Sequence, residues 1–183
     1  MSRLARALLS AGMDVTLIVD GANVMGSRAD GWWRDRAGAM ARLHGELAAL
    51  AAHGVAGPVP GVTEAAGGAA EAGAARSAGE AAAAGEAGGS AGKASAGEAG
   101  GDRWFPQIDL VVEGRARAVL DLVEPAPRVR VVAARGEGDD EIASLAGRLT
   151  GRRVVVTADR ELRRRSQAAG AAVTGPRWLL DLL

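Results

Sequence analysis

The sequence predicts an α/β domain built on a mainly parallel sheet of about five strands, with helices on both faces. Short apolar runs rich in β-branched residues recur along the chain, as expected for strands that are buried on both faces. Segments with apolar residues at helical spacing separate these runs. Strands that alternate with helices join through right-handed crossovers, which gives three layers of helix, sheet and helix. The expected strands are residues 15–19, 108–112, 129–133, 153–157 and 171–173.

A long amphipathic helix is expected after the first strand. Asp35 can cap its start, and apolar residues such as Met40 and Leu43 recur at helical spacing. Gly54 is placed to end the helix, since glycine commonly follows the last helical turn. His44 lies within this helix, and we expect it at the surface of the protein.

Three further helices are expected in the second half of the chain. One begins near Asp139, with Ile142 on its apolar face. A second follows Asp159 and runs to Gln167. Pro176 opens the last helix, because proline suits the first helical position. Each of the first two helices follows a predicted strand, as a parallel sheet requires.

A Gly/Ala-rich segment, residues 55–101, interrupts the domain. Apart from two prolines, its only apolar side chains larger than alanine are valines near its start, and it holds five acids and two bases. Such a composition buries too little surface to offset the entropy of ordering the chain. We therefore expect a disordered insertion within a domain of residues 15–183, preceded by a short leader of residues 1–14.

The composition excludes several classes of protein. There is no cysteine, which excludes a disulfide framework, a thiolate zinc site and a cysteine nucleophile. No stretch approaches the ~20 apolar residues needed to cross a bilayer, so we expect a cytoplasmic protein without a membrane partner. The 22 acids balance the 22 bases. Because the insertion is acidic, the rest of the chain is mildly basic, which allows a nucleic-acid partner.

Carboxylates stand where the predicted strands end. Asp20, Glu113 and Asp159 each lie at or just past such an end, where open parallel sheets bind their ligands. Asp139 and Asp140 begin a helix that follows another strand, so they can face the same crevice. Closely spaced carboxylates repel one another unless a cation compensates them. All five are candidate ligands of Mg²⁺ or Mn²⁺, which suit all-oxygen sites. The alternative is structural, with the aspartates acting as helix caps or turn residues.

Three motifs carry a resemblance to a known family. They are Val-Asp-Gly-Ala-Asn at residues 19–23, Gly-Asp-Asp-Glu-Ile at residues 138–142 and Val-Thr-Ala-Asp-Arg-Glu-Leu at residues 156–162. In this order, each at its own strand end, they resemble the NYN branch of the PIN-like nucleases. The run of residues 26–36 resembles an actinobacterial NYN subgroup. The resemblance implies a PIN-like α/β/α fold and a ribonuclease that depends on Mg²⁺ or Mn²⁺.

The resemblance also implies roles for single residues. Asp20 matches the central metal ligand, and Asn23 matches a polar neighbour that orients substrate or a ligand water. Asp139 and Asp159 match the second and third acids, so these three aspartates are the expected catalytic residues. Asp140 can share the role of Asp139, although successive helix residues point about 100° apart.

Contacts to substrate are expected from basic, hydroxyl and aromatic side chains. Arg34 and Arg163 are candidates to bind RNA phosphates, and Thr157 is a candidate to bind a phosphate or a ligand water. Trp32 and Trp33 stand beside arginines and suit base stacking. Packing of at least one of the two tryptophans into the domain is nevertheless the stronger expectation.

Three functional classes remain open. The first is a metal-dependent ribonuclease acting on single-stranded RNA, the second an RNA-binding module without catalysis, and the third a nucleotide phosphohydrolase. The third lacks an Asp-x-Asp motif after the first strand, because Gly21 and Ala22 follow Asp20. Retention of all three family acids favours the ribonuclease over the binding module.

Overall fold

The computed structural model describes residues 15–61 and 103–183. The expected leader, residues 1–14, and residues 62–101 of the expected insertion lie outside the described residues. Within the two described ranges, no helix is both long enough and apolar enough to span a membrane.

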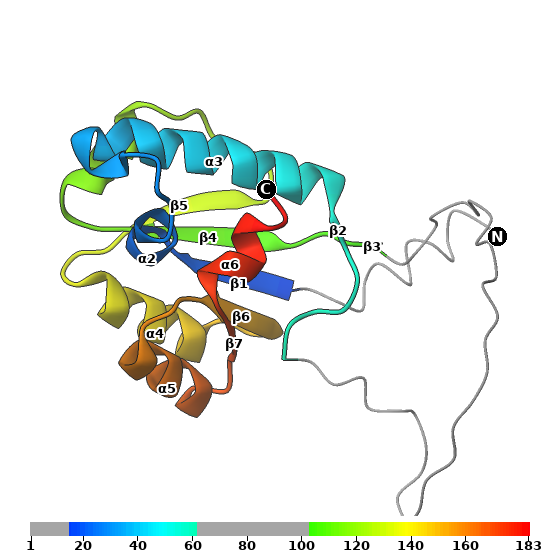
Figure 1. Ribbon diagram of the computed structural model, residues 1–183. Coiled ribbons are helices and arrows are strands. Elements are labelled where there is room, and N and C mark those ends of the chain that lie inside the picture. The colour runs from blue at the N-terminus through cyan, green and yellow to red at the C-terminus, as the bar shows by residue number, and fades with distance from the viewer. Residues whose placement is uncertain (1–14, 62–102) are drawn as a thin grey trace, which may run out of the picture. The chain divides into compact units, whose positions relative to one another are not determined.

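A five-stranded sheet lies at the centre of the domain (Figure 1). Its order is β5-β4-β1-β6-β7, and every neighbouring pair of strands is parallel. The expected α/β fold and its five strands are confirmed, with strand ends that differ by one residue at most from those expected. The strands are β1 (Val15–Asp20), β4 (Gln107–Val112), β5 (Val129–Ala133), β6 (Arg152–Val156) and β7 (Ala172–Thr174).

Helices cover both faces of the sheet, so the domain has three layers. One face is covered by α3 and the 3-10 helix η2, and the other by α4 and α5. Residues of β1 alternate between the two cores, because successive side chains of a strand point to opposite faces. Leu17 and Val19 pack on the α3 side, whereas Ile18 packs on the α4 side. The bounds of these helices are α3 (Arg36–His53), η2 (Gly114–Asp121), α4 (Gly138–Arg148) and α5 (Arg160–Ala168).

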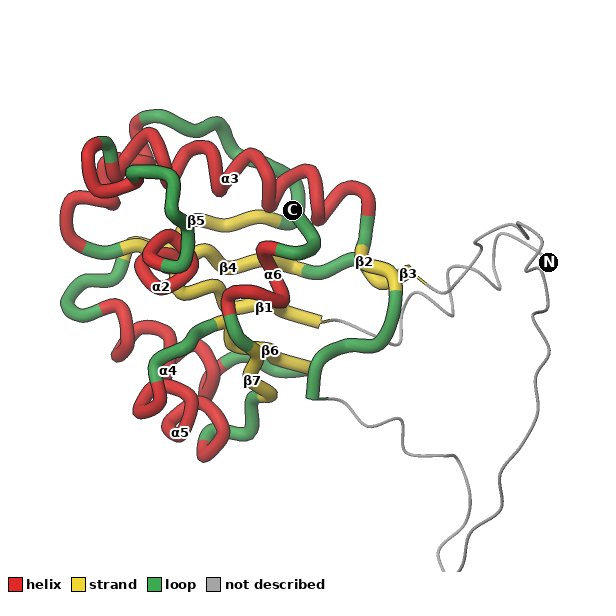
Figure 2. Tube along the Cα trace, viewed as in Figure 1, coloured by secondary structure: helices red, strands yellow, loops and turns green. Residues whose placement is uncertain are grey.

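Figure 2 shows where the helices begin and end, and capping residues set several of these ends. Asp35 accepts a hydrogen bond from the backbone N–H of Gly38 at 2.9 Å and so begins α3, as expected. Gly54 ends α3 in a conformation with φ of 74°, which favours glycine. A short 3-10 helix, η1 (Trp32–Arg34), precedes α3, and α6 (Pro176–Leu180) begins at its expected proline.

The insertion starts later than the composition indicated. A short strand, β2 (Val55–Ala56), pairs with β3 (Arg103–Trp104) in an antiparallel arrangement. Val55 and Val59 are buried in the same core as α3. The average composition of the whole Gly/Ala-rich segment did not indicate that these two valines pack into the core, or that Val55 pairs with Trp104. Residues 55–61 therefore belong to the domain and not to the insertion.

His44 is buried, so the expectation that it lies at the surface is wrong. Its side chain is 6% exposed, and burial lowers the pKa of its imidazole. It follows Leu43 and lies one helical turn after Met40, which places it on the inward face of α3. Because α3 contacts both the sheet and η2, the buried part of its surface is wider than the pattern of its apolar residues indicates.

Candidate functional site

The carboxyl ends of β1 and β6 define a crevice. These strands are neighbours in the sheet, but β1 leads to α3 on one face and β6 leads to α5 on the other. Diverging connections of this kind leave room for a ligand beyond the strand ends. A pocket of about 460 Å³ opens there, lined by Asp20, Ala22, Asn23, Gly26, Ser27, Val111, Glu113, Gly138, Asp139, Ile142 and Asp159.

Asp20 ends β1 and is held from two sides. Its Oδ1 accepts a hydrogen bond from the backbone N–H of Asn23 at 3.0 Å, and its Oδ2 accepts one from the hydroxyl of Thr157 at 2.9 Å. The first bond caps the short helix α2 (Gly21–Gly26), which starts directly after the strand. Because Asp20 is only 7% exposed, these two bonds fix the orientation of its carboxylate.

Glycine is required directly after Asp20. A Cβ atom on Gly21 would lie 2.7 Å from the carbonyl oxygen of Val111 and 2.9 Å from Cε of Met40. The Met40 side chain can shift, but the backbone carbonyl of Val111 cannot move aside as easily, so glycine at this position lets α2 lie close to β4. The Asp-Gly pair of the first motif therefore positions both the carboxylate and the helix that it caps.

Thr157 joins Asp20 to Asp159 from beneath the pocket. Its side chain is fully buried and is not among the described residues that line the pocket. The hydroxyl donates to Asp20 and accepts from the backbone N–H of Asp159 at 3.1 Å. The Thr157 hydroxyl thus positions the carboxylate of Asp20 and the backbone of Asp159, and its expected contact with substrate stays a prediction.

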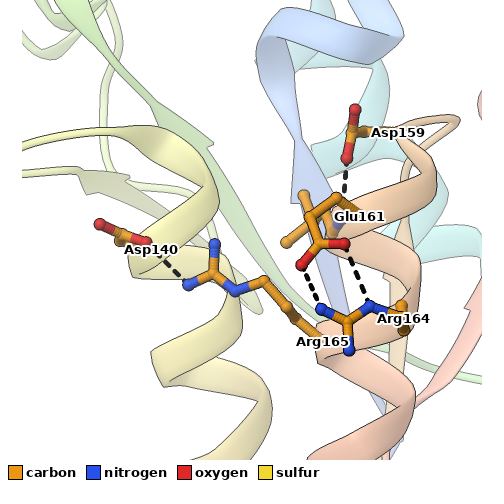
Figure 3. A network of polar contacts seen from close by, with 6 residues as sticks. Asp140, Asp159, Glu161, Arg164 and Arg165 are labelled. Carbon is orange, nitrogen blue, oxygen red and sulfur yellow. Dashed lines mark hydrogen bonds and ion pairs between the residues drawn. The ribbon is translucent and has the colours of Figure 1, made fainter.

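Asp159 is both a helix cap and a pocket residue. Its Oδ1 accepts from the backbone N–H of Leu162 at 2.7 Å, which begins α5 (Figure 3). Asn23 holds the same loop, because its side-chain oxygen accepts from the backbone N–H of Ala158 at 2.9 Å. Asp159 and Asp20 therefore each cap a helix and line the pocket at the same time.

Glu113 sets the start of α4 and thereby the place of Asp139. Its Oε2 accepts from the backbone N–H of Gly138, the first residue of the helix, at 2.6 Å. This contact is favourable because a helix presents unpaired N–H groups and partial positive charge at its start. Asp139 is the next residue and lines the pocket. Within the described ranges its carboxylate has no hydrogen bond or ion pair.

Asp140 lies outside the pocket, unlike its neighbour. Its Oδ1 forms an ion pair with Nη2 of Arg165 at 2.7 Å, which links α4 to α5 (Figure 3). The side chain is exposed and is not among the described residues that line the pocket. The turn of about 100° between successive helix residues separates Asp140 from Asp139. Of the two, Asp139 is the one placed to act at the pocket.

Burial and neighbouring carboxylates raise the pKa of Asp20 and of Asp139. Burial is the largest cause of the raised pKa of Asp20, and repulsion from Asp139 and Glu113 adds to it. Hydrogen bonds from Asn23 and Thr157 act in the opposite direction. The pKa of Asp139 is also raised, first by burial and then by the charges of Asp159 and Glu113. The ionised pocket therefore carries electrostatic strain that positive charge would relieve.

The donor set suits a hard divalent cation. Asp20, Glu113, Asp139 and Asp159 offer only oxygen atoms, which Mg²⁺ and Mn²⁺ prefer. In the described part of the chain, no group of three or more acid or histidine side chains is arranged to hold a metal ion on its own. Mg²⁺ is usually bound through one or two carboxylates and keeps several waters. The residues present therefore fit a hydrated cation and not a closed cage of protein ligands.

The two arginines expected to contact RNA do not line the pocket. Nη1 of Arg163 donates to the carbonyl oxygen of Thr157 at 3.1 Å, which supports the loop after β6. Arg34 is exposed on η1, with its guanidinium carbon 5.9 Å from the ring centroid of Trp33. Trp32 packs partly against the core and Trp33 is exposed. The expectation that at least one tryptophan packs into the domain is therefore confirmed.

Ser27 and Gly26 line the pocket, although the sequence did not single them out as site residues. The hydroxyl of Ser27 donates to the carbonyl oxygen of Asn23 at 2.9 Å and so closes α2. Because α2 has only 6 residues, its end stays within about 9 Å of its start. The short distance from Asp20 along the chain was the signal that could have identified both.

Comparisons with known proteins support the fold. No known protein family and no curated protein matches the sequence. Among solved structures, the chain is similar to the crystal structure of a point mutant of Rae1 (YacP) from Bacillus subtilis. The TM-score is 0.53 at 15% sequence identity, and the match covers 92% of this chain and 74% of that chain. At this identity the likeness shows the fold alone, a PIN-like α/β/α arrangement with a parallel sheet of five strands.

Proposed function

We propose that this protein is a metal-dependent ribonuclease that cleaves RNA phosphodiesters with Mg²⁺ or Mn²⁺. One observation carries the proposal: the carboxylates of Asp20, Glu113, Asp139 and Asp159 come from separate segments and line one pocket. Asp20 and Asp139, whose pKa values are raised by burial and by neighbouring carboxylates, destabilise the fold when they are ionised. The presence of such acids together in one pocket therefore indicates a functional site. The NYN-like motifs of the sequence supply the reaction class.

The residues of the pocket divide into ligands and positioning groups. Asp20, Asp139 and Asp159 would hold a hydrated cation, through one or two direct carboxylate contacts and through its waters, with Glu113 as a further candidate ligand. When bound, such a cation lowers the pKa of a coordinated water and stabilises negative charge on phosphate oxygens. Thr157 lowers the pKa of Asp20 through its hydrogen bond. It thereby favours the ionised carboxylate, which is the form that binds a cation.

The test is cleavage of a labelled single-stranded RNA by the purified protein with Mn²⁺, with Mg²⁺ or with a chelator. Asp159→Asn should abolish metal-dependent cleavage, because it removes a charged ligand while asparagine still caps α5. The affinity for RNA without metal should stay equal or rise slightly, since one repulsive charge is lost. Asp140→Asn is the matched control. It removes a nearby acid that is paired with Arg165 outside the pocket, so cleavage should continue.

The same assay distinguishes the other two functional classes. Binding of RNA without cleavage under any divalent metal would contradict the ribonuclease and favour a binding module. Hydrolysis of nucleotides without binding or cleavage of RNA would favour a phosphohydrolase. Cleavage that persists unchanged in Asp159→Asn would show that the pocket acids are not the catalytic residues.

A further inference from the structure

An exposed tryptophan stands on the loop between α2 and α3. Trp33 belongs to η1, and its side chain is 56% exposed. Its neighbour Trp32 is partly buried against the core. The two rings meet edge to face, with centroids 6.3 Å apart and planes at 84°. Trp33 is therefore a large ring that is supported by a packed residue and open to solvent.

Two arginines accompany the pair of tryptophans. The guanidinium carbon of Arg34 lies 5.9 Å from the ring centroid of Trp33, and that of Arg36 lies 5.4 Å from the centroid of Trp32. Both distances are within the range of cation–π contacts. Neither guanidinium group forms an ion pair or a hydrogen bond with another of the described residues. Their charges thus remain available to a negatively charged partner.

The acids of this loop are engaged with the backbone. Asp30 accepts a hydrogen bond from the backbone N–H of Trp32 at 3.2 Å. Asp35 accepts from the backbone N–H of Gly38 at 2.9 Å. Each carboxylate therefore stabilises the turn or the helix start next to it. This arrangement leaves the two arginines unpaired although acids are close to them in sequence.

The loop is fixed to the domain and begins at the pocket. Arg28 donates to both carboxylate oxygens of Glu46 on α3, at 3.3 and 2.5 Å. Ser27 lines the pocket, and the chain from there to Trp33 can span at most roughly 20 Å. Figure 1 shows α2, the start of α3 and the start of α4 at the same end of the sheet. A ligand that occupies the pocket can therefore extend toward the exposed ring.

We propose that Trp33 is a base-stacking platform for single-stranded RNA that enters the carboxylate pocket, with Arg34 contacting a phosphate beside it. The inference rests on the proposed ribonuclease function and names its substrate class. A flat aromatic ring accepts any unpaired base, because every base has a π-face. The bases of a duplex are already stacked on one another, so the platform selects single strands without reading their sequence.

A nucleic acid fits this surface better than a protein partner. Aromatic anchors of protein interfaces insert into well-packed apolar pockets and are surrounded by contacts that exclude water. Trp33 instead stands beside unpaired positive charge, and the other ring of the pair is already packed into the domain. Aromatic rings beside positively charged groups are a combination with which proteins hold single strands.

The experiment measures binding apart from cleavage, in the presence of chelator. A short RNA is offered to the full-length protein as a single strand and as a duplex. Trp33→Ala should weaken binding of the single strand at least about fivefold, the lower end of the loss expected for one stacked base. Binding of the duplex should not change. Trp33→Phe should retain most of the affinity, because an aromatic ring remains.

Phe105→Ala provides a matched control. Phe105 is 43% exposed, and the guanidinium carbon of Arg128 lies 6.0 Å from its ring centroid. The pair resembles Trp33 with Arg34. However, Phe105 directly precedes β4 and Arg128 directly precedes β5, so both lie at the opposite end of the sheet from the pocket. Phe105→Ala should bind single strands as the wild type does. Arg34→Ala should weaken binding and lower its salt dependence by about one unit of slope.

Tryptophan fluorescence separates failure of this inference from failure of the ribonuclease proposal. Quenching by uncleaved RNA that is lost in Trp33→Phe would support the platform even if no metal yields cleavage. Equal single-strand affinity of Trp33→Ala and the wild type would overturn the platform, and continued cleavage by the variant would leave the ribonuclease proposal in place. A change in self-association on Trp33→Ala, with RNA binding unchanged, would mark the surface as a protein contact and overturn the inference.

Discussion

Replacing Thr157 by valine should loosen the pocket from beneath. The substitution keeps the branched shape of the side chain and removes a fully buried hydroxyl. That hydroxyl donates to Asp20 at 2.9 Å and accepts from the backbone N–H of Asp159 at 3.1 Å. Valine therefore leaves a buried carboxylate oxygen and a backbone N–H without their partners, which is costly in a protein interior.

The two bonds set the size of the effect. A hydrogen bond to a charged group contributes about 1.5–3 kcal/mol, and a neutral one contributes about 1 kcal/mol. We therefore expect Thr157→Val to lower the free energy of unfolding by about 3 kcal/mol at neutral pH, measured by urea denaturation. Thr157→Ser keeps the hydroxyl and loses one methyl group, so its loss should be closer to about 1 kcal/mol.

The effect of Thr157→Val should also depend on pH. In the wild type the hydroxyl lowers the pKa of Asp20, so it stabilises the ionised carboxylate. Its removal raises the folded-state pKa further, and the part of the added instability that comes from the lost bond to Asp20 is present only while Asp20 is ionised. The difference between variant and wild type should therefore shrink as the pH falls through the pKa of Asp20. A loss of stability below about 1 kcal/mol, or one that is independent of pH, would refute this reasoning.

Three further variants test how the pocket is built. Gly21→Ala places a Cβ atom 2.7 Å from a backbone carbonyl and should lower the free energy of unfolding by about 1–3 kcal/mol; wild-type stability in urea would contradict the close packing. Protonated Asp139 stabilises the fold below about pH 4, and this contribution is lost as the pH rises through its raised pKa. Asp139→Asn should therefore have a higher melting temperature than the wild type at neutral pH without metal. Equal melting temperatures would argue against a destabilising charge at Asp139. Glu113→Gln keeps an acceptor for Gly138 and removes a charge, so NMR titration should find lower pKa values for Asp20 and Asp139; unchanged values would show that Glu113 does not act on them.

Local signals explain why most of the fold was predicted. The apolar runs of the strands and the ends of α3 at Asp35 and Gly54 depend on residues close together in sequence. The order β5-β4-β1-β6-β7 depends on contacts between distant segments, and no periodicity encodes it. The pairing of Val55 with Trp104 across the Gly/Ala-rich segment was missed for the same reason.

The candidate site was predicted as a set of acids but not as an arrangement. Parallel strands bring their carboxyl ends to one edge, which is why acids after three different strands could be grouped from the sequence. The family resemblance favoured Asp139 over Asp140, but local sequence could not give their directions, because these depend on where α4 starts, and Glu113 holds that start. The burial of Thr157 follows from the position of β6 between β1 and β7, which the sequence does not state.

The central claim is that the pocket carboxylates hold a divalent cation, and calorimetric titration with Mn²⁺ tests it most directly. The wild type should bind Mn²⁺ saturably. Asp20→Asn should weaken that binding at least tenfold, or about 1.4 kcal/mol. Asp140→Asn should leave it unchanged, because Asp140 is paired with Arg165 outside the pocket. Equal Mn²⁺ affinity in Asp20→Asn and the wild type would contradict the account.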